Sequence, residues 1–366
     1  MPSVVSLCEY GTIYGGENSM LCGLPELEAR GFKVAVACPA DSQLAAEVVS
    51  QGFAHLPVVW TDESGRRKPL EVLRDELAQL TAAWQADIVH ANSLSVARIL
   101  GPVERPAGCK FVGHLRDIIK LNRRVVADIS QLDEIYCVST ATRDFHVAQG
   151  LREANSWVLH NGIDLTKFSP PEQQTDRAPL RLVYIGQLVM RKGVDVLLEG
   201  VRLAIAQGAN VTLDLYGECH SAKQEAADYL ADLHRRSQRD ELAGRVHFRG
   251  RTDDAATVLQ QADTLVHAAR QEPWGRVLLE AAACGLPIVA TAVGGTREMF
   301  PAGECLLVSP DDPPGIADAL GKLCEDFALR KTLGLKARQR MEQWGISDYA
   351  DKLVARYQNV LRPPAK

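Results

Sequence analysis

The chain has 366 residues, 46% of them hydrophobic and 24% charged, which fits a soluble protein with sizeable cores and excludes intrinsic disorder and fibrous repeats. At a typical ~150 residues per domain, this length predicts two domains. The 41 basic and 46 acidic residues leave a net charge of −5, and neither half of the chain is strongly basic, so no nucleic-acid partner is expected.

Short apolar runs alternate with longer helical patterns along the whole chain. This alternation is typical of parallel sheets covered by helices on both faces. In the first half, strands are expected at residues 4–8, 33–38, 55–59, 87–90, 110–114, 134–138 and 157–160. In the second half they are expected at residues 180–185, 212–216, 246–249, 264–267, 287–290 and 305–308.

The two halves are separated by a polar segment, residues 169–179, with prolines at positions 170, 171 and 179. It has no apolar periodicity, and we interpret it as a linker. The fold class is therefore α/β, with two Rossmann-like, doubly wound parallel-sheet domains at residues 1–170 and 180–346. Such sheets bind ligands beyond the carboxyl ends of their strands, so an interdomain cleft is the expected place for a site.

A glycine-rich turn follows the first expected strand. Gly15 and Gly16 have no Cβ, so their backbone can approach a ligand closely, and the helical pattern after them offers N–H groups to a phosphate. The spacing is not that of a dinucleotide site. A tight turn without a ligand is the alternative.

The segment 115–126 has apolar residues at helical spacing and the basic residues Arg116, Lys120, Arg123 and Arg124 on the remaining arc. We expect a basic amphipathic helix. Such a helix could pack one face on its sheet, bind an acidic acceptor, or contact an anionic membrane as a peripheral protein does.

Two adjacent cations, Arg191 and Lys192, follow the strand expected at 180–185 and precede a helix expected from about Val194. Fixed cations beside a helix N-terminus suit a diphosphate whose negative charge grows as it leaves. A solvated pair of basic residues on a loop is the alternative.

The segment 271–290 is the most informative part of the sequence. Glu272 follows the strand expected at 264–267, and Glu280 lies eight residues further on, about two helical turns later. Both carboxylates are expected near the carboxyl edge of the sheet. Carboxylates accept hydrogen bonds from hydroxyl-rich ligands such as a ribose or a hexose.

These motifs together resemble those of the retaining family-4 (group 1) glycosyltransferases of the GT-B fold. The resemblance is carried by Glu272-Pro273-Trp274-Gly275, Glu280-Ala281, residues 285–290 and Gly294-Gly295-Thr296-Arg297-Glu298. It extends to Gly15-Gly16, His114, Asn161-Gly162-Ile163-Asp164, Lys192-Gly193-Val194-Asp195 and His247-Phe248-Arg249-Gly250, and thus to most of the chain. It implies transfer of a sugar from a nucleotide diphosphate to a hydroxyl acceptor with retention of configuration. It also implies that a C-terminal helix, 347–361, returns to the first domain.

The resemblance implies a role for each of the motif residues. Glu280 would hold the ribose, and Glu272 would contact hydroxyls of the donor sugar. The backbone of Pro273, Trp274, Gly275 and Arg276 would steady that sugar. Arg191, Lys192, Gly15 and Gly16 would bind the diphosphate. His114 would lie near the reacting face of the donor, and the nucleotide base would lie near Gly250 and Arg251.

Three positions depart from the family pattern. Gln187 stands where many members have an arginine, so the phosphate role passes to Arg191 and Lys192. Gly217-Glu218-Cys219 replaces a G-x-G turn, and Ala269 replaces a common serine.

No cofactor and no metal are expected, because fixed cations are available and no Asp-x-Asp cluster lies in the relevant segments. The adjacent pairs Asp253-Asp254 and Asp311-Asp312 are interpreted as helix caps or solvated turns. The nine cysteines contain no C-x-x-C pair, and the first residues do not resemble a signal peptide. A cytoplasmic protein is expected. A nucleotide-sugar epimerase, a phosphorylase-like enzyme and a non-catalytic sugar-nucleotide binder remain alternatives.

Overall fold

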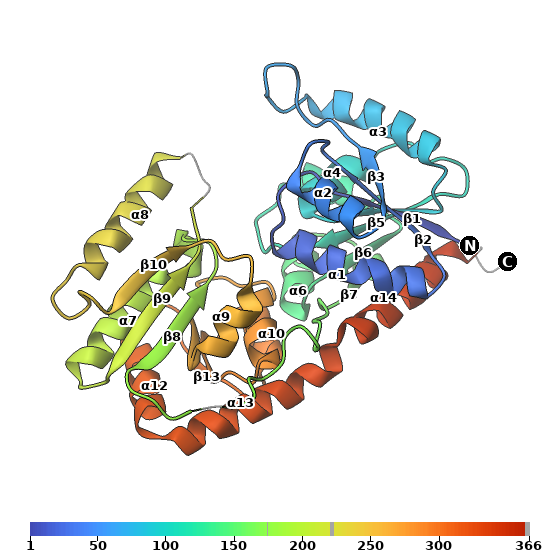
Figure 1. The fold of residues 1–366 in the computed structure, drawn as a ribbon. Coiled ribbons are helices and arrows are strands. Elements are labelled where there is room, and N and C mark those ends of the chain that lie inside the picture. Colours follow the sequence, from blue (N-terminus) through green and yellow to red (C-terminus); the bar gives the residue numbers. More distant parts are fainter. Residues whose placement is uncertain (174, 220–222, 363–366) are drawn as a thin grey trace. The chain divides into compact units, whose positions relative to one another are not determined.

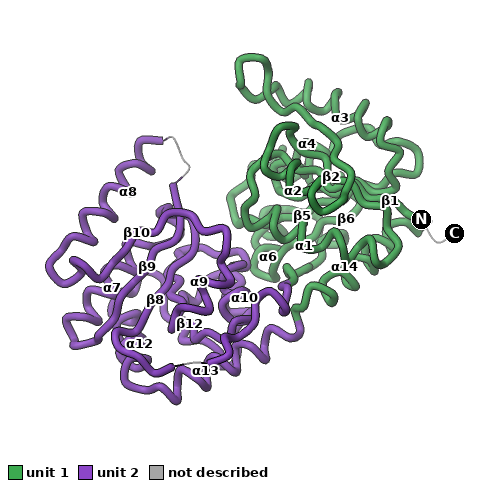
Figure 2. Tube along the Cα trace, viewed as in Figure 1, with its two compact units in different colours: residues 1–162, 344–366 green, residues 163–343 purple. Residues whose placement is uncertain are grey.

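The computed structural model describes residues 1–173, 175–219 and 223–362. The chain divides into two compact units (Figures 1 and 2). Unit 1 is Met1–Gly162 together with the C-terminal segment from Trp344, and unit 2 is Ile163–Gln343. The division therefore falls between Gly162 and Ile163, whereas the sequence pattern placed the linker at 169–179.

Unit 1 contains one parallel seven-stranded sheet with the strand order β3-β2-β1-β4-β5-β6-β7. Its strands are β1 (Ser3–Leu7), β2 (Lys33–Cys38), β3 (Ala54–Pro57), β4 (Ile88–Ala91), β5 (Lys110–Leu115), β6 (Glu134–Cys137) and β7 (Ser156–Val158). Its helices are α1 (Gly15–Ala29), α2 (Gln43–Ser50), α3 (Leu70–Trp84), α4 (Leu94–Leu100), α5 (Arg123–Ile129), α6 (Thr140–Val147) and α14 (Ile346–Leu361), with a short 3-10 turn, Glu153–Asn155.

The strands of unit 1 are apolar on both faces, and each face has its own core. Val5 and Val89 pack in one cluster with residues of α3, α4 and α5. Their sequence neighbours Val4 and Ile88 pack in a second cluster with residues of α1, α2 and α14. Because successive strand residues point to opposite faces, continuous apolar runs produce this doubly covered sheet.

Unit 2 contains a parallel six-stranded sheet with the order β10-β9-β8-β11-β12-β13. Its strands are β8 (Leu180–Ile185), β9 (Val211–Tyr216), β10 (Val246–Gly250), β11 (Thr264–His267), β12 (Ile288–Thr291) and β13 (Leu306–Val308). The helices are α7 (Val194–Ala206), α8 (Gln224–Ser237), α9 (Ala255–Gln261), α10 (Arg276–Ala283), α11 (Gly295–Met299), α12 (Pro313–Glu325) and α13 (Phe327–Met341). A 3-10 turn, η2 (Met190–Lys192), precedes α7, and another, η3 (Glu342–Trp344), precedes α14.

The predicted fold class of two doubly wound parallel-sheet domains is confirmed. The strands lie where the apolar runs placed them, with ends that coincide or differ by one or two residues. The expected capping roles are also confirmed, since Asp254 accepts from the N–H of Thr257 at 3.1 Å and Asp312 from that of Gly315 at 3.0 Å. No helix in the described ranges is long and apolar enough to cross a bilayer.

The prediction of one amphipathic helix over residues 115–126 is wrong. Leu115 ends strand β5, residues 116–122 have no regular secondary structure, and α5 starts only at Arg123. The backbone of this segment bonds to side chains near α6: His146 contacts the Asp117 carbonyl at 2.8 Å, and Gln149 accepts from the Leu121 N–H at 2.6 Å. These bonds replace a helical ladder, so the expected membrane contact loses the helix on which it rested.

Candidate active site

The order of the strands in unit 2 reverses between β8 and β11, which are neighbours in the sheet. Connections leave these two strands in opposite directions, so their carboxyl ends border an open crevice, the usual ligand site of such sheets. The segment after β8 carries Arg191 and Lys192 on η2, and the segment after β11 carries Glu272. The topology thus brings together the cations and the first motif carboxylate.

Lys192 and Glu272 form a buried ion pair at this crevice. The Lys192 Nζ lies 2.5 Å from Glu272 Oε2, and the two side chains are only 13% and 6% exposed. His267 Nε2 lies 2.7 Å from the same oxygen. Burial alone would raise the pKa of Glu272, but the Lys192 charge and the His267 hydrogen bond outweigh burial and hold this pKa well below its usual range.

His267 is a site residue that the sequence analysis did not select. It is the last residue of β11, fully buried, and it lies in an apolar run that reads as an ordinary core strand. Burial lowers its pKa, so the imidazole is neutral at physiological pH. A histidine at the end of a strand, five residues before a motif glutamate, is the signal that could have found it.

Two glycines permit the tight backbone around this pair. Gly193 has a φ of +64°, and a Cβ there would lie 2.0 Å from the carbonyl oxygen of Ala268. Gly275 has a φ of +80°, and a Cβ there would lie 2.7 Å from Leu278 Cδ1. Only glycine fits at these positions, where the loops after β8 and β11 touch and where α10 begins.

Arg270 holds the turn that carries the two cations. Its guanidinium donates to both carboxylate oxygens of Asp195, at 2.9 and 2.7 Å, and to the carbonyl of Met190 at 2.7 Å. Its backbone N–H also donates to the Arg191 carbonyl. A third carboxylate bond, to Asp311 at 2.7 Å, ties it to the segment after β13. Arg270 was missed in the sequence because its partners lie far away along the chain.

Glu280 lies on α10, one turn after Arg276. The Arg276 Nε donates to Glu280 Oε1 at 2.8 Å, and both side chains are largely buried. Burial raises the pKa of Glu280, and the Arg276 charge partly offsets this. The pair therefore presents a carboxylate whose ionisation depends on its arginine neighbour.

The remaining candidates of unit 2 occupy different surroundings. Pro273 and Trp274 form the turn into α10, with Trp274 buried. Arg191 donates to the side chain of Gln187 at 3.3 Å. Arg251 follows the edge strand β10 and pairs with Asp253 at 3.2 Å, well apart in the strand order from Glu272. The base-binding role implied for Arg251 stays a prediction.

In unit 1 the strand order reverses between β1 and β4; Gly15 and Gly16 follow β1, and His114 lies on β5, next to β4. Gly15 begins α1, and the Gly16 carbonyl accepts from Asn92 at 3.3 Å. His114 has no exposed surface, and Arg116 lies 3.1 Å from its Nδ1. Burial, followed by the Arg116 charge, lowers the pKa of His114 well below its usual range. It is thus a buried neutral side chain, and its implied contact with a donor stays a prediction.

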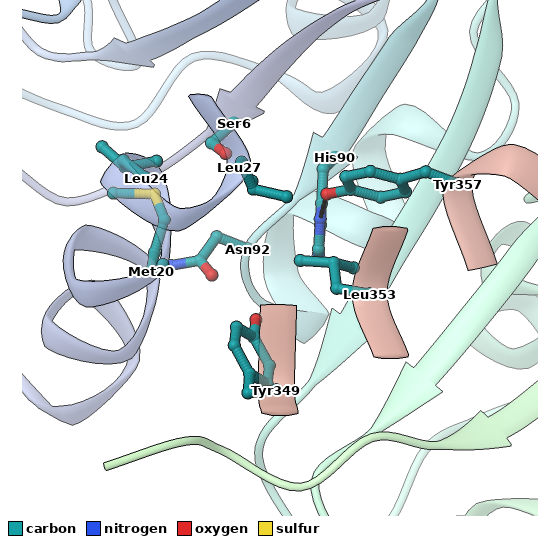
Figure 3. Close-up of a pocket in the computed structure, with 10 residues that line it drawn as sticks. Ser6, Met20, Leu24, Leu27, His90, Asn92, Tyr349, Leu353 and Tyr357 are labelled. Atoms are coloured by element: carbon teal, nitrogen blue, oxygen red, sulfur yellow. Dashed lines mark hydrogen bonds between the residues drawn. The ribbon is translucent and has the colours of Figure 1, made fainter. Parts of the chain in front are cut away.

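A small cavity of about 10 Å³ lies on the α1 and α14 face of this sheet. Figure 3 shows the Tyr357 hydroxyl directed at His90, and these groups are 2.5 Å apart. Asn92 and Tyr349 also line the cavity. Its volume suits about one water molecule and is too small for a sugar or nucleotide.

Among the residues that the structure describes, no group of three or more His, Cys, Asp or Glu side chains could hold a metal ion.

Comparisons with known proteins identify the family to which the chain belongs. Residues 179–326 match the family described as Glycosyl transferases group 1, and residues 14–167 match Glycosyltransferase Family 4. A D-inositol 3-phosphate glycosyltransferase from Xylanimonas cellulosilytica is 31% identical over 311 residues, covering 77% of this chain and 69% of that protein. A glycogen synthase of Mycobacterium tuberculosis is 26% identical, over 83% of this chain and 75% of that protein. A phosphatidylinositol N-acetylglucosaminyltransferase component from Arabidopsis thaliana is 27% identical, over 74% of this chain and 57% of that protein.

Solved structures share the fold over nearly the whole chain. Anabaena HepE in complex with UDP-glucose superposes with a TM-score of 0.83 at 20% identity, covering 98% of this chain and 99% of that one. A glycosyltransferase from Rickettsia africae superposes with a TM-score of 0.82 at 15% identity, covering 99% of each chain. The chain belongs to the group 1 glycosyltransferases of family 4 and has the GT-B fold.

Proposed function

We propose that this protein transfers a sugar from a nucleoside diphosphate to a hydroxyl acceptor with retention of anomeric configuration. The observation that carries the proposal is the Lys192–Glu272 pair at the β8–β11 crevice, with Arg191 beside it. Cations suit the diphosphate and a carboxylate suits the sugar hydroxyls. The complexes of Anabaena HepE with UDP and with UDP-glucose support a sugar nucleotide as the donor.

In the proposed reaction, the bond between the anomeric carbon and the diphosphate oxygen breaks. A new bond forms from the acceptor oxygen to that carbon, and the acceptor proton passes to the departing diphosphate. Arg191 and Lys192 offset the negative charge that grows on the diphosphate as it leaves. Glu280 accepts hydrogen bonds from the ribose hydroxyls, and Glu272 accepts one from the donor sugar.

Retention is proposed without a covalent intermediate on Glu272. Its Oε2 is already bound by Lys192 and His267, and its pKa is well below the usual range, so the carboxylate is a weak nucleophile. A same-face displacement assisted by the leaving phosphate fits these groups better. The stereochemical test is NMR of the newly formed glycosidic bond, and an inverted product would refute this part of the proposal.

The first experiment is thermal stabilisation and turnover against UDP-glucose, UDP-N-acetylglucosamine, GDP-mannose and ADP-glucose. Release of nucleoside diphosphate that requires an acceptor supports a transferase. Sugar interconversion without this release supports an epimerase instead, and stabilisation without any turnover supports a non-catalytic binder.

The proposed reaction needs no metal, because Arg191, Lys192 and the N-terminus of α7 supply the positive charge near the diphosphate. We therefore expect EDTA to leave turnover unchanged. A loss of turnover that Mg²⁺ or Mn²⁺ restores would show this part of the proposal to be wrong.

A further inference from the structure

The rigid partner of Glu272 is His267, not the lysine. Lys192 reaches Glu272 from the end of a long side chain on a 3-10 turn, whereas His267 is the last residue of a buried central strand. The ring of Tyr184, on the neighbouring strand β8, stacks on the imidazole with a centroid distance of 6.3 Å and an interplanar angle of 11°. The His267 ring is therefore fixed by its place on strand β11 and by the Tyr184 ring that stacks on one of its faces.

The chemistry of the pair determines which atom carries the proton. Glu272 is ionised and can only accept, so the His267 Nε2 must carry the hydrogen of the 2.7 Å bond. Burial opposes a second proton on the ring, and the charges of Lys192 and Arg191 add to this; together they outweigh Glu272, so the pKa of His267 is lowered. The other ring nitrogen, Nδ1, is buried and has no partner among the described residues. The imidazole is thus a neutral, single-tautomer donor.

The two hydrogen bonds leave one oxygen of Glu272 available. Lys192 and His267 both bind Oε2. In the described part of the chain no hydrogen bond reaches Oε1. The carboxylate is therefore anchored at Oε2, and its Oε1 has no hydrogen-bond partner among the described residues.

We propose that His267 is a positioning residue that fixes Glu272 so that Oε1 accepts a hydrogen bond from a hydroxyl of the transferred sugar. The inference rests on the proposed function and deepens it, because it divides the two oxygens of one carboxylate between the protein and the donor. His267 itself touches no substrate. Loss of His267 should therefore weaken binding of the sugar nucleotide but not of the nucleoside diphosphate, which lacks the transferred sugar and its hydroxyl.

The test uses His267→Leu, which fills much of the ring volume without a donor, and His267→Gln, whose amide N–H can reach the place of Nε2. His234→Leu is the control, since His234 is an exposed histidine on α8 that packs on Phe248. Calorimetry measures the affinity for the sugar nucleotide of the panel that the wild type transfers fastest, and separately for its nucleoside diphosphate. Steady-state kinetics give kcat and KM for the same donor.

We expect His267→Leu to lose about tenfold or more in sugar-nucleotide kcat/KM, the effect of one hydrogen bond to a charged group. Its affinity for the nucleoside diphosphate should stay within about twofold of wild type, since that ligand makes no bond to Glu272 Oε1. His267→Gln should recover most of the loss, and His234→Leu should match the wild type. A general destabilisation of unit 2 would instead lower the affinity for the sugar nucleotide and for the nucleoside diphosphate alike.

Several outcomes would overturn the inference. Equal losses of both affinities in His267→Leu would show a structural role only, and wild-type kinetics would show no role. If His267→Leu does not fold, His267→Gln is compared with His267→Asn, whose shorter amide cannot reach Oε2. Equal activity of these two then overturns the inference. A wild type that binds no sugar nucleotide of the panel refutes the proposed function itself, and the inference with it.

Discussion

Breaking the Lys192–Glu272 pair should destabilise unit 2 strongly. With side chains 13% and 6% exposed, removal of either partner leaves a charge that is poorly hydrated. Losing one partner of a buried pair costs about 3–5 kcal/mol, and the lower end applies because Lys192 retains some exposure. For the residues of unit 2, Ile163–Gln343, about 3 kcal/mol corresponds to a fall of about 6–12 °C in Tm.

A double-mutant cycle measures the coupling within the pair. The variants are Lys192→Met, Glu272→Gln and their combination, unfolded in urea as the full chain at pH 7. That pH is chosen because the pKa of Glu272 is lowered on folding, so its contribution is present above the ordinary carboxyl pKa and is lost only as the pH falls through the lower folded value. The combination should cost about 2–3 kcal/mol less than the sum of the single variants.

The matched control is the exposed pair Arg249–Asp214. It has a comparable separation of 2.7 Å, but its side chains are 48% and 30% exposed. Its coupling, from Arg249→Met and Asp214→Asn, should be about 1 kcal/mol or less. If the Lys192–Glu272 coupling is no larger than that of this control, burial does not strengthen the pair and the reasoning fails.

Three further predictions concern neighbours of the site and the C-terminal helix. Arg270→Met should weaken nucleoside diphosphate binding about tenfold, because the η2 turn loses its contacts with Arg270. Arg270→Lys should retain part of the binding affinity. Unchanged affinity of both variants in calorimetry would contradict this. Arg276→Met should raise the pKa of Glu280 further, because the Arg276 charge partly offsets the effect of burial. Nucleotide affinity should then fall more steeply between pH 8 and pH 5.5 than in wild type. Equal pH dependence of the affinity in variant and wild type would count against this. Tyr357→Phe should lower the free energy of unfolding by about 1 kcal/mol, since it leaves His90 without its hydroxyl partner, with donor kinetics unchanged; an altered donor KM would link α14 to the site instead.

The sheets were predictable because parallel strands buried on both faces require continuous apolar runs. Residues 33–38 and 264–267 illustrate this, since their expected and observed bounds coincide. Residues 115–126 form a different case. Their apolar spacing fits a helix, yet the backbone partners that decide the conformation are side chains about thirty residues later, His146 and Gln149.

The same distinction applies to the candidate site. Glu272 and Lys192 were found because they follow strands, where a ligand site is expected, and the topology then placed them in contact. His267 and Arg270 were missed for different reasons. His267 reads as core, and the partners of Arg270 lie 75 residues away at Asp195 and 41 residues away at Asp311. Residues that hold other residues in place are defined by long-range contacts, which a single sequence does not display.

The charges at the crevice bear on the proposed binding of a diphosphate by a chain of net charge −5. The charge of Lys192 is offset by Glu272, so the pair contributes little net field before a ligand arrives. Arg191 differs, because its hydrogen-bond partner is the neutral amide of Gln187, and no ion pair to it exists among the described residues. Its charge is therefore uncompensated. An arginine at position 187, as many members of the family have, would repel Arg191, whereas the glutamine orients it. The departure at Gln187 thus leaves Arg191 as a cation without a carboxylate partner among the described residues, beside the mutually offset Lys192–Glu272 pair.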